Sequence, residues 1–251
     1  MADVKSADPW QALRRFTSAR IGLGRAGASL PTAEILRFGL AHAEARDAVH
    51  LALDVAGLEA ALRPRYGPSL VVHSRAPDRA SYLLRPDLGR RLDDASASLL
   101  AHTGGRPAEG YDLAFVVADG LSALAVQRHA PALLDEIAPL LPADWTLAPP
   151  VVALQGRVAL GDEIGERLAA RMLVMLIGER PGLSSPDSLG AYLTWDPRPG
   201  RSDAQRNCVS NIRPEGLAYF AAARRIAWLL SESRRLKLTG VGLKDRSDLL
   251  A

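Results

Sequence analysis

Residues 172–178 read Met-Leu-Val-Met-Leu-Ile-Gly, a continuous apolar run that ends at a glycine. Strands of a parallel sheet carry such unbroken runs because helices cover both of their faces. Residues 113–120, Leu-Ala-Phe-Val-Val-Ala-Asp-Gly, show the same pattern, and shorter runs lie at 69–73 and 149–156. These four segments predict neighbouring strands of one buried, mainly parallel sheet.

Stretches with helical apolar spacing alternate with these runs. They lie at 85–102, 121–141, 161–171 and 217–235, and a further strand-like segment, Ala-Tyr-Leu-Thr-Trp-Asp, lies at 191–196. Alternation of strand and helix is typical of α/β domains. We therefore expect residues 67–251 to form an α/β domain whose mainly parallel sheet is flanked by helices, with a Rossmann-like core.

The N-terminal region, residues 1–66, shows helical patterns without strand-like apolar runs. Asp8-Pro9 is a helix-start signal that predicts a helix over 9–20, and Pro31-Thr32 opens a second amphipathic run. That run places four apolar residues on one face, Ile35, Leu36, Leu40 and Ala43. We expect a helical N-terminal arm that docks on a partner.

Composition limits the class of protein. With 251 residues and 48% hydrophobic content, the chain can bury one large core. No run of about 18 apolar residues is present, and the first ten residues lack the apolar region of a signal peptide. The single cysteine, Cys208, excludes an internal disulfide and a cysteine-cluster metal site. We expect a cytoplasmic protein that does not span a membrane.

The net charge is only +3, yet the basic residues are nearly all arginine, the lysines being Lys5, Lys237 and Lys244. This bias has two explanations, a surface that binds anions or proteins and a GC-rich genome. Aromatic residues make up only 5% and do not interleave with basic ones, so no stacking platform for nucleic acid is predicted.

Residues 22–27, Gly-Leu-Gly-Arg-Ala-Gly, spell the G-x-G-x-x-G fingerprint of dinucleotide-binding folds. The fingerprint requires a strand before its first glycine and a helix that opens at its last. Here a helical segment precedes the first glycine, and a proline interrupts the chain after the last one. Two interpretations stay open: a nucleotide-binding turn, and an arginine-bearing loop that docks on a partner.

Two strand ends carry carboxylates. Asp119 and Ser122 follow one buried run, where an open α/β sheet presents ligands, although either residue can instead cap the next helix. Glu179 follows the run at 172–178 and must find hydrogen-bond donors, because an unpaired buried carboxylate is costly. A ligand and an internal salt bridge with Arg180 or another arginine are the two interpretations of Glu179.

No catalytic set is recognisable. The five histidines are scattered without an i, i+4 pair, so no metal site is predicted. No serine lies in a G-x-S-x-G elbow, and no histidine lies near Cys208 in the sequence.

Several short motifs in a fixed order resemble the small subunit of ethanolamine ammonia-lyase. The most distinctive read Arg-Ile-Gly-Leu-Gly-Arg-Ala-Gly, Gly-Glu-Arg-Pro-Gly-Leu and Asn-Cys-Val-Ser-Asn-Ile. The resemblance covers almost the whole chain in the segments Thr17–Gly27, Tyr82–Leu92, Asp119–Ser122, Gly156–Val158, Asp162–Glu166, Gly178–Leu183, Asp187–Leu189 and Asn207–Ile212.

This resemblance implies a non-catalytic subunit of a carbon–nitrogen lyase that is inactive alone. A large subunit would carry the catalytic residues and convert ethanolamine to acetaldehyde and ammonia, with adenosylcobalamin held between the two subunits of a hetero-oligomer. The resemblance places cobalamin contacts of this chain at Val158, Glu179 and Cys208, and it implies a cobalamin-binding-like core.

Two further expectations come from the motifs. The D-x-H-x-x-G motif of proteins that supply a histidine to cobalt is absent, since Leu100 stands two residues before His102, so we expect the cofactor to keep its benzimidazole. The chain lacks the long N-terminal extension associated with bacterial microcompartments in some family members, which leaves encapsulation open. Two alternative functions remain: a free-standing nucleotide-binding enzyme, and a structural assembly subunit without cofactor contact.

Overall fold

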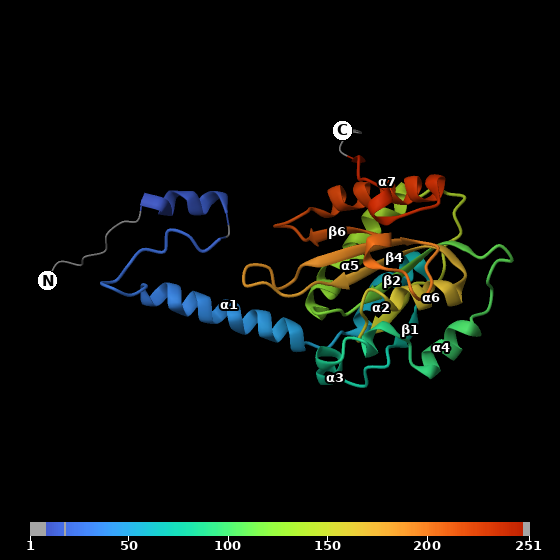
Figure 1. Cartoon of the computed structure of the whole chain (residues 1–251), viewed down its shortest axis with the longest axis horizontal. Helices are drawn as coiled ribbons and strands as arrows, with labels where there is room; N and C mark the ends of the chain where they lie inside the picture. The colour runs from blue at the N-terminus through green and yellow to red at the C-terminus, as the bar shows by residue number, and fades with distance from the viewer. Residues whose placement is uncertain (1–8, 18, 248–251) are drawn as a thin grey trace.

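The computed structural model describes residues 9–17 and 19–247, within which one six-stranded sheet runs in the order β1-β3-β2-β4-β5-β6 (Figure 1). The strands are Leu70–His73 (β1), Tyr111–Ala118 (β2), Val151–Leu154 (β3), Ala170–Gly178 (β4), Leu189–Trp195 (β5) and Arg206–Ile212 (β6). The strands β1, β3, β2 and β4 pair in parallel, which confirms the four strands predicted from apolar runs.

Two sheet pairings differ from the predicted architecture. Strand β5 pairs antiparallel with β4, and β6 pairs antiparallel with β5, so the sheet is mixed. A parallel return requires a long crossover, and the short β4–β5 connection contains no helix. Strand β6 was not predicted, because this edge strand has a polar sequence that buries only Arg206, Val209 and Ile212.

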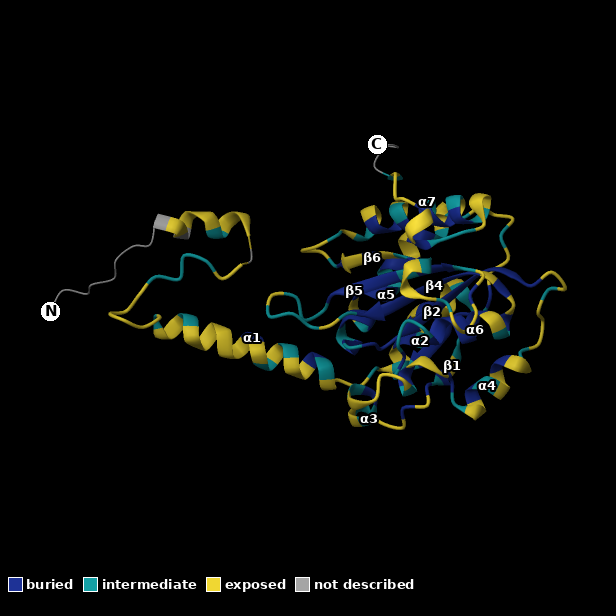
Figure 2. Cartoon of the chain, in the orientation of Figure 1, coloured by how far each residue is buried: buried dark blue, intermediate teal, exposed yellow. Residues whose placement is uncertain are grey.

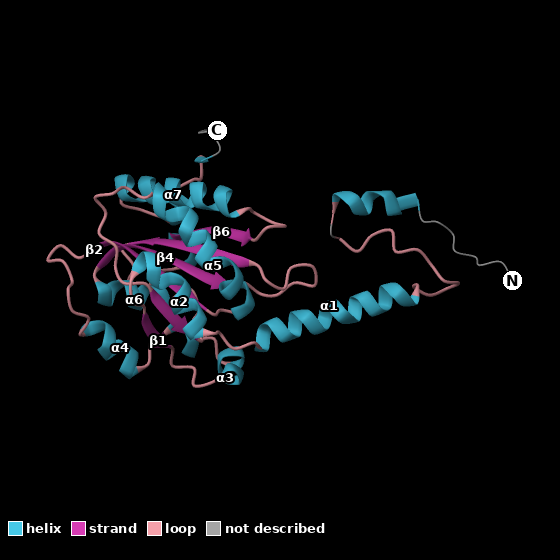
Figure 3. Ribbon diagram, turned by 180° about the vertical axis from the view of Figure 1, so that it is seen from behind, coloured by secondary structure: helices cyan, strands magenta, loops and turns pink. Residues whose placement is uncertain are grey.

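Helices cover both faces of the sheet (Figure 3). The α-helices are Thr32–His50 (α1), Val55–Tyr66 (α2), Arg79–Leu84 (α3), Asp94–Ala101 (α4), Ala123–Ile137 (α5), Leu160–Leu168 (α6) and Tyr219–Leu236 (α7). Short 3-10 helices are Pro9–Phe16 (η1), Leu88–Arg90 (η2), Ala138–Leu140 (η3), Asp203–Gln205 (η4) and Gly240–Gly242 (η5). The alternation of strand and helix between 69 and 178 is confirmed.

The core lies in two layers. On one face, α2, α5 and α7 pack against Phe115, Val174 and their neighbours, and this face is called the α7 face. On the other face, α4 and α6 pack against Val116 and Met175, and this face is called the α6 face. Helix α2 belongs to the first layer, although it lies on the N-terminal side of the predicted boundary at residue 66; that division of the chain remains a prediction.

The N-terminal arm extends away from the α/β domain (Figures 1 and 2). The helix predicted over 9–20 is instead the 3-10 helix η1, which ends at Phe16, where the Thr17 hydroxyl accepts a hydrogen bond from the Ala19 amide at 3.1 Å and forms a turn. Helix α1 is confirmed, but it buries only Ala41 and Ala48.

Most of the predicted apolar face of α1 is uncovered. Its Ile35, Leu36 and Leu40 side chains are 53%, 68% and 60% exposed. No helix of residues 9–17 and 19–247 is long and apolar enough to cross a membrane.

Asp112 joins β2 to three other parts of the domain. Its carboxylate accepts hydrogen bonds from the Thr146 amide at 2.9 Å, from Arg171 at 3.1 Å and from Arg234 on α7 at 2.5 Å. Burial by itself raises the pKa of Asp112, but the hydrogen bonds from Thr146 and Arg234 outweigh it and hold that pKa below its ordinary value.

We expect Asp112→Asn to cost about 1–3 kcal/mol of unfolding free energy at neutral pH, because a buried charged acceptor is lost. Since the folded pKa is depressed, the contribution of Asp112 is complete above the unfolded value of about 4 and is lost as pH falls below it. Urea unfolding from pH 7 to pH 3 checks this. The gap between wild type and variant should shrink with acid, and a constant gap would contradict it.

Candidate functional site

A pocket of about 360 Å³ opens where β2, β3 and β4 end. Carboxyl ends of neighbouring parallel strands are the usual ligand position in open α/β sheets. The pocket is lined by Tyr82, Leu121, Arg157, Val158, Ile177, Gly178, Glu179, Arg180 and Tyr192. Two of the three predicted site residues, Val158 and Glu179, therefore line one pocket.

Asp119 positions the loop that carries Val158. This buried carboxylate at the end of β2 accepts hydrogen bonds from the backbone amides of Gln155 at 2.9 Å and Gly156 at 3.1 Å. Gln155 has a φ of 53°, which a non-glycine residue adopts only when its surroundings fix it. Burial raises the pKa of Asp119, while the amide hydrogen bonds and the nearby Arg79 oppose that rise. Asp119 is thus part of the scaffold behind the pocket.

Tyr82, from α3, forms the inner wall next to this loop. Its hydroxyl donates a hydrogen bond to the Gly156 carbonyl at 3.0 Å, and its side chain is fully buried. The Arg157 guanidinium lies 4.1 Å from the ring centroid and donates a hydrogen bond to the Tyr82 carbonyl at 3.0 Å. Arg157 is therefore held against a fixed aromatic face.

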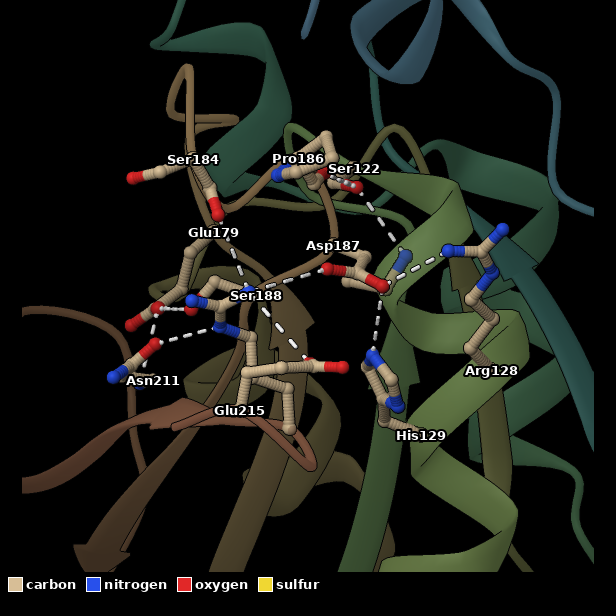
Figure 4. A network of polar contacts seen from close by, with 12 residues as sticks. Ser122, Arg128, His129, Glu179, Ser184, Pro186, Asp187, Ser188, Asn211 and Glu215 are labelled. Carbon is tan, nitrogen blue, oxygen red and sulfur yellow. Dashed lines mark hydrogen bonds and ion pairs between the residues drawn. The ribbon is translucent and has the colours of Figure 1, made fainter. Parts of the chain in front are cut away.

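The Glu179 carboxylate lies over β5 rather than beside an arginine. It accepts hydrogen bonds from the Ser188 hydroxyl and, at 3.2 Å, from the backbone amide of Asn211, as Figure 4 shows. A Cβ atom at Gly190 would lie 2.9 Å from Oε1 of Glu179, so glycine makes room for the carboxylate. Within the described part of the chain, Glu179 forms no ion pair with Arg180 or any other arginine.

Cys208, the third predicted residue, lies next to the pocket on the edge strand β6. It stands opposite Tyr192 in the β5–β6 register, and Tyr192 lines the pocket. Desolvation of the thiol raises the pKa of Cys208, a hydrogen bond with Tyr192 lowers it, and the charge of Glu179 raises it further. The residue as a whole is nevertheless exposed, because Cys208 occupies the open α6 face of the edge strand.

A buried ion pair fixes β6 against α6. Arg206 donates hydrogen bonds to both carboxylate oxygens of Asp162, at 2.5 and 2.6 Å, and to the Thr194 hydroxyl at 3.0 Å. Both charged side chains are only 2% exposed. Since Arg206 is two residues before Cys208, this pair sets the position of Cys208 relative to the loop before α6.

The β4–β5 loop, residues 179–188, is anchored at several points (Figure 4). Ser122 accepts a hydrogen bond from the Ala125 amide and so caps α5, and its hydroxyl donates to the Pro186 carbonyl at 2.9 Å. Asp187 pairs with Arg128 on α5 at 2.9 Å. The helix-capping interpretation of Ser122 is correct, and the loop that begins at Glu179 is tied to the domain.

Three residues of the pocket that carry polar groups, Tyr82, Arg157 and Tyr192, were not singled out from the sequence. Tyr82 and Arg157 lie within segments quoted for the family resemblance, and this was the only feature of the sequence that pointed to them. Tyr192 lies in a segment predicted only as a strand, and its place beside Cys208 depends on an antiparallel pairing that was not predicted.

The glycine turn at 22–27 lacks the context of a nucleotide site. Within the described residues 9–17 and 19–31, a 3-10 helix and a loop precede Pro31, and no strand leads into the first glycine. Among the described residues, no group of three or more His, Cys, Asp or Glu side chains is arranged to hold a metal ion.

Comparison with known proteins agrees with the motifs. Residues 7–244 match the model of the family described as ethanolamine ammonia-lyase light chain (EutC). The chain belongs to this family. It is 60% identical over 242 residues to the ethanolamine ammonia-lyase small subunit of Xanthomonas campestris, covering 96% of this chain and 89% of that protein. It is 59% identical over 243 residues to the protein of the same name from Azotobacter vinelandii, covering 96% and 90%.

We expect Glu179→Gln to lower the pKa of the Cys208 thiol, because it removes the negative charge that raises this pKa. The pH dependence of iodoacetamide alkylation measures the effect cleanly, since the chain has one cysteine. Glu215→Gln, at an exposed carboxylate beyond β6, is the matched control and should leave the thiol unchanged. An unchanged or higher pKa in Glu179→Gln would contradict the assigned effect of the Glu179 charge on the thiol.

Proposed function

We propose that this chain is the small, non-catalytic subunit of an adenosylcobalamin-dependent ethanolamine ammonia-lyase, which converts ethanolamine to acetaldehyde and ammonia. The observation that carries the proposal is the convergence of Val158, Glu179 and Cys208, from three separate segments, around one pocket and its Tyr192 edge. These are the positions at which the family resemblance implies cobalamin contacts.

The chemistry of the pocket suits a corrin with peripheral amides. Glu179 supplies acceptor oxygens for amide N–H groups, the two arginines of the lining supply hydrogen-bond donors, and Val158 supplies an apolar contact. Cys208 would pack as a small polarizable side chain rather than bind cobalt. Donors and acceptors are thus both present beside apolar side chains in one pocket, as small-molecule sites require.

The size of the pocket supports a shared site. Its volume of about 360 Å³ is near the lower limit for small-molecule sites, and cobalamin is a much larger molecule. The α6 face of β5 and β6 stays open beside it, with Cys208 exposed. A large subunit would therefore cover the remainder of the cofactor and hold it between the two chains.

The cofactor, when bound, supplies the radical that starts the reaction by homolysis of its cobalt–carbon bond. The residues of this chain hold and orient the corrin through Glu179 and Val158. The packing of the β3–α6 loop and the β4–β5 loop keeps those contacts in fixed positions and keeps water from that side of the cofactor. Acid–base chemistry on ethanolamine is assigned to the large subunit.

The N-terminal arm is the proposed docking element for the large subunit. Four arginines and no acidic residue lie between residues 9 and 31, and α1 exposes apolar side chains along most of its length. Apolar surface of this kind on an extended helix is stabilised by a partner that buries it.

Co-expression with a large subunit of the same family tests the function. The two chains should co-purify, and ethanolamine turnover with adenosylcobalamin should require both. Turnover by the rigorously purified single chain would refute the subunit assignment, and failure of the two chains to associate would refute the partnership.

We expect Glu179→Gln to weaken adenosylcobalamin binding to the assembled complex by about 1–3 kcal/mol, because one charged acceptor is lost from the site. Thermal stability should change little, since Ser188 and Asn211 can still donate to the amide oxygen. Equilibrium dialysis and thermal melting of the same variant measure both quantities. Unchanged affinity beside a large loss of stability would assign Glu179 to the scaffold.

Replacing Arg14, Arg15, Arg20 and Arg25 by Ala should weaken assembly with the large subunit while changing the melting temperature of the lone chain little. Arg14 pairs with the half-buried Glu34 inside the arm itself, and the 3.4 Å hydrogen bond from Arg20 to the Leu183 carbonyl is exposed, so neither contact contributes much to folding of the α/β domain. The affinity loss should diminish at high salt.

A matched control replaces four exposed arginines of the α/β domain, Arg65, Arg85, Arg198 and Arg235. It should assemble like the wild type. A lower melting temperature with intact assembly in the arm variant would overturn the docking role.

A further inference from the structure

We infer that Arg157 is the anion anchor of the pocket and binds the phosphodiester of the cofactor's nucleotide loop. The inference rests on the proposed function and extends it, because the family resemblance assigns no role to this arginine. It identifies which chemical group of the ligand faces the loop between β3 and α6.

The charges around the pocket leave Arg157 without an acidic partner. Arg79, whose guanidinium also lies over the Tyr82 ring, has a carboxylate partner, because it lies 3.8 Å from the Asp119 carboxylate. It also donates hydrogen bonds to the Val49 carbonyl at 2.7 Å and the Gly120 carbonyl at 2.8 Å, although its Nη2 atom is buried without a hydrogen-bond partner. Arg157 forms no ion pair with any carboxylate in the described part of the chain, and its Nε atom is buried without a hydrogen-bond partner. Because Arg157 lines the pocket and no carboxylate offsets its charge, its guanidinium is suited to bind an anion there.

Glu179 does not neutralise this charge internally, because its carboxylate is turned over β5 toward Ser188 and Asn211. The pocket therefore presents an acceptor at one end and an unpaired guanidinium at the other. Cobalamin matches this polarity: its peripheral amides are neutral donors and acceptors, and its phosphodiester is an anion.

Arg157 is also better prepared for this role than Arg180, the other arginine on the rim. Arg157 is half-buried, stacks on Tyr82 and donates to the Tyr82 carbonyl, so little side-chain freedom is lost when a ligand binds. Arg180 is exposed at the start of the β4–β5 loop. A planar guanidinium with fixed orientation suits the two free oxygens of a phosphodiester.

The test compares two truncated corrinoids that differ only in the phosphate. Adenosylcobinamide lacks the whole nucleotide, whereas adenosylcobinamide phosphate keeps the phosphate without the base. We expect the wild-type complex with the large subunit to bind the phosphate form at least about tenfold more tightly, by equilibrium dialysis. Arg157→Gln should reduce that ratio to near one, and Arg157→Lys, which keeps the charge, should retain part of it.

The ratio of the affinities for adenosylcobinamide phosphate and adenosylcobinamide, measured on one variant, separates loss of a ligand contact from damage to the fold. Damage to the fold would weaken the binding of both ligands alike and leave the ratio unchanged. Arg180→Gln is the charge-matched control and should keep most of the preference. An unchanged ratio in Arg157→Gln, or an equal loss in Arg180→Gln, would overturn the assignment to Arg157. Failure of adenosylcobalamin itself to bind the wild-type complex would instead overturn the proposed function.

Discussion

The buried carboxylate of Asp119 is the constraint on which the site depends. Asp119 lies at the end of β2, and its carboxylate accepts hydrogen bonds from two backbone amides of the neighbouring β3–α6 loop. These two hydrogen bonds hold Gln155 in a left-handed conformation. Arg157 and Val158, which follow Gln155 in this loop, line the pocket. Because the carboxylate is buried, losing either amide would remove a hydrogen bond that water cannot readily replace, so the loop has one favoured arrangement.

The second determinant is the unequal covering of the sheet. On the α7 face, helices cover the strands out to β6, whereas on the α6 face the cover stops near β4 and leaves Tyr192 half-buried and Cys208 exposed. The Arg206–Asp162 pair holds this open edge at a fixed position relative to α6. The pocket and the uncovered part of the sheet beside it form one continuous, fixed surface. Such a surface is expected of one side of a ligand site that two subunits share. The exposed apolar residues of α1 fit the same view of a chain completed by a partner.

Much of this architecture could be predicted from the sequence, and the failures have physical reasons. Continuous apolar runs identified β2 and β4 because both faces of these strands are buried. Strand β6 escaped prediction because an edge strand buries few side chains, and without it the Tyr192–Cys208 pairing could not be foreseen. The mixed sheet was missed for another reason: the short, helix-free connection between β4 and β5 permits only an antiparallel return, and this was not taken into account. Glu179 was correctly singled out as a carboxylate in need of donors, but its donors come from Ser188 and Asn211, whose approach depends on tertiary pairing.

If the surface around Tyr192 and Cys208 contacts adenosylcobalamin within the assembled complex, bound cofactor must shield the Cys208 thiol. The most direct measurement is the rate of Cys208 alkylation in that complex with and without cofactor, followed by mass spectrometry of the peptide that contains it. We predict that bound cofactor slows the modification, while the lone chain reacts at the same rate with or without cofactor. An unchanged rate in a complex shown to hold the cofactor would contradict the proposed contact and favour a structural subunit that touches no cofactor.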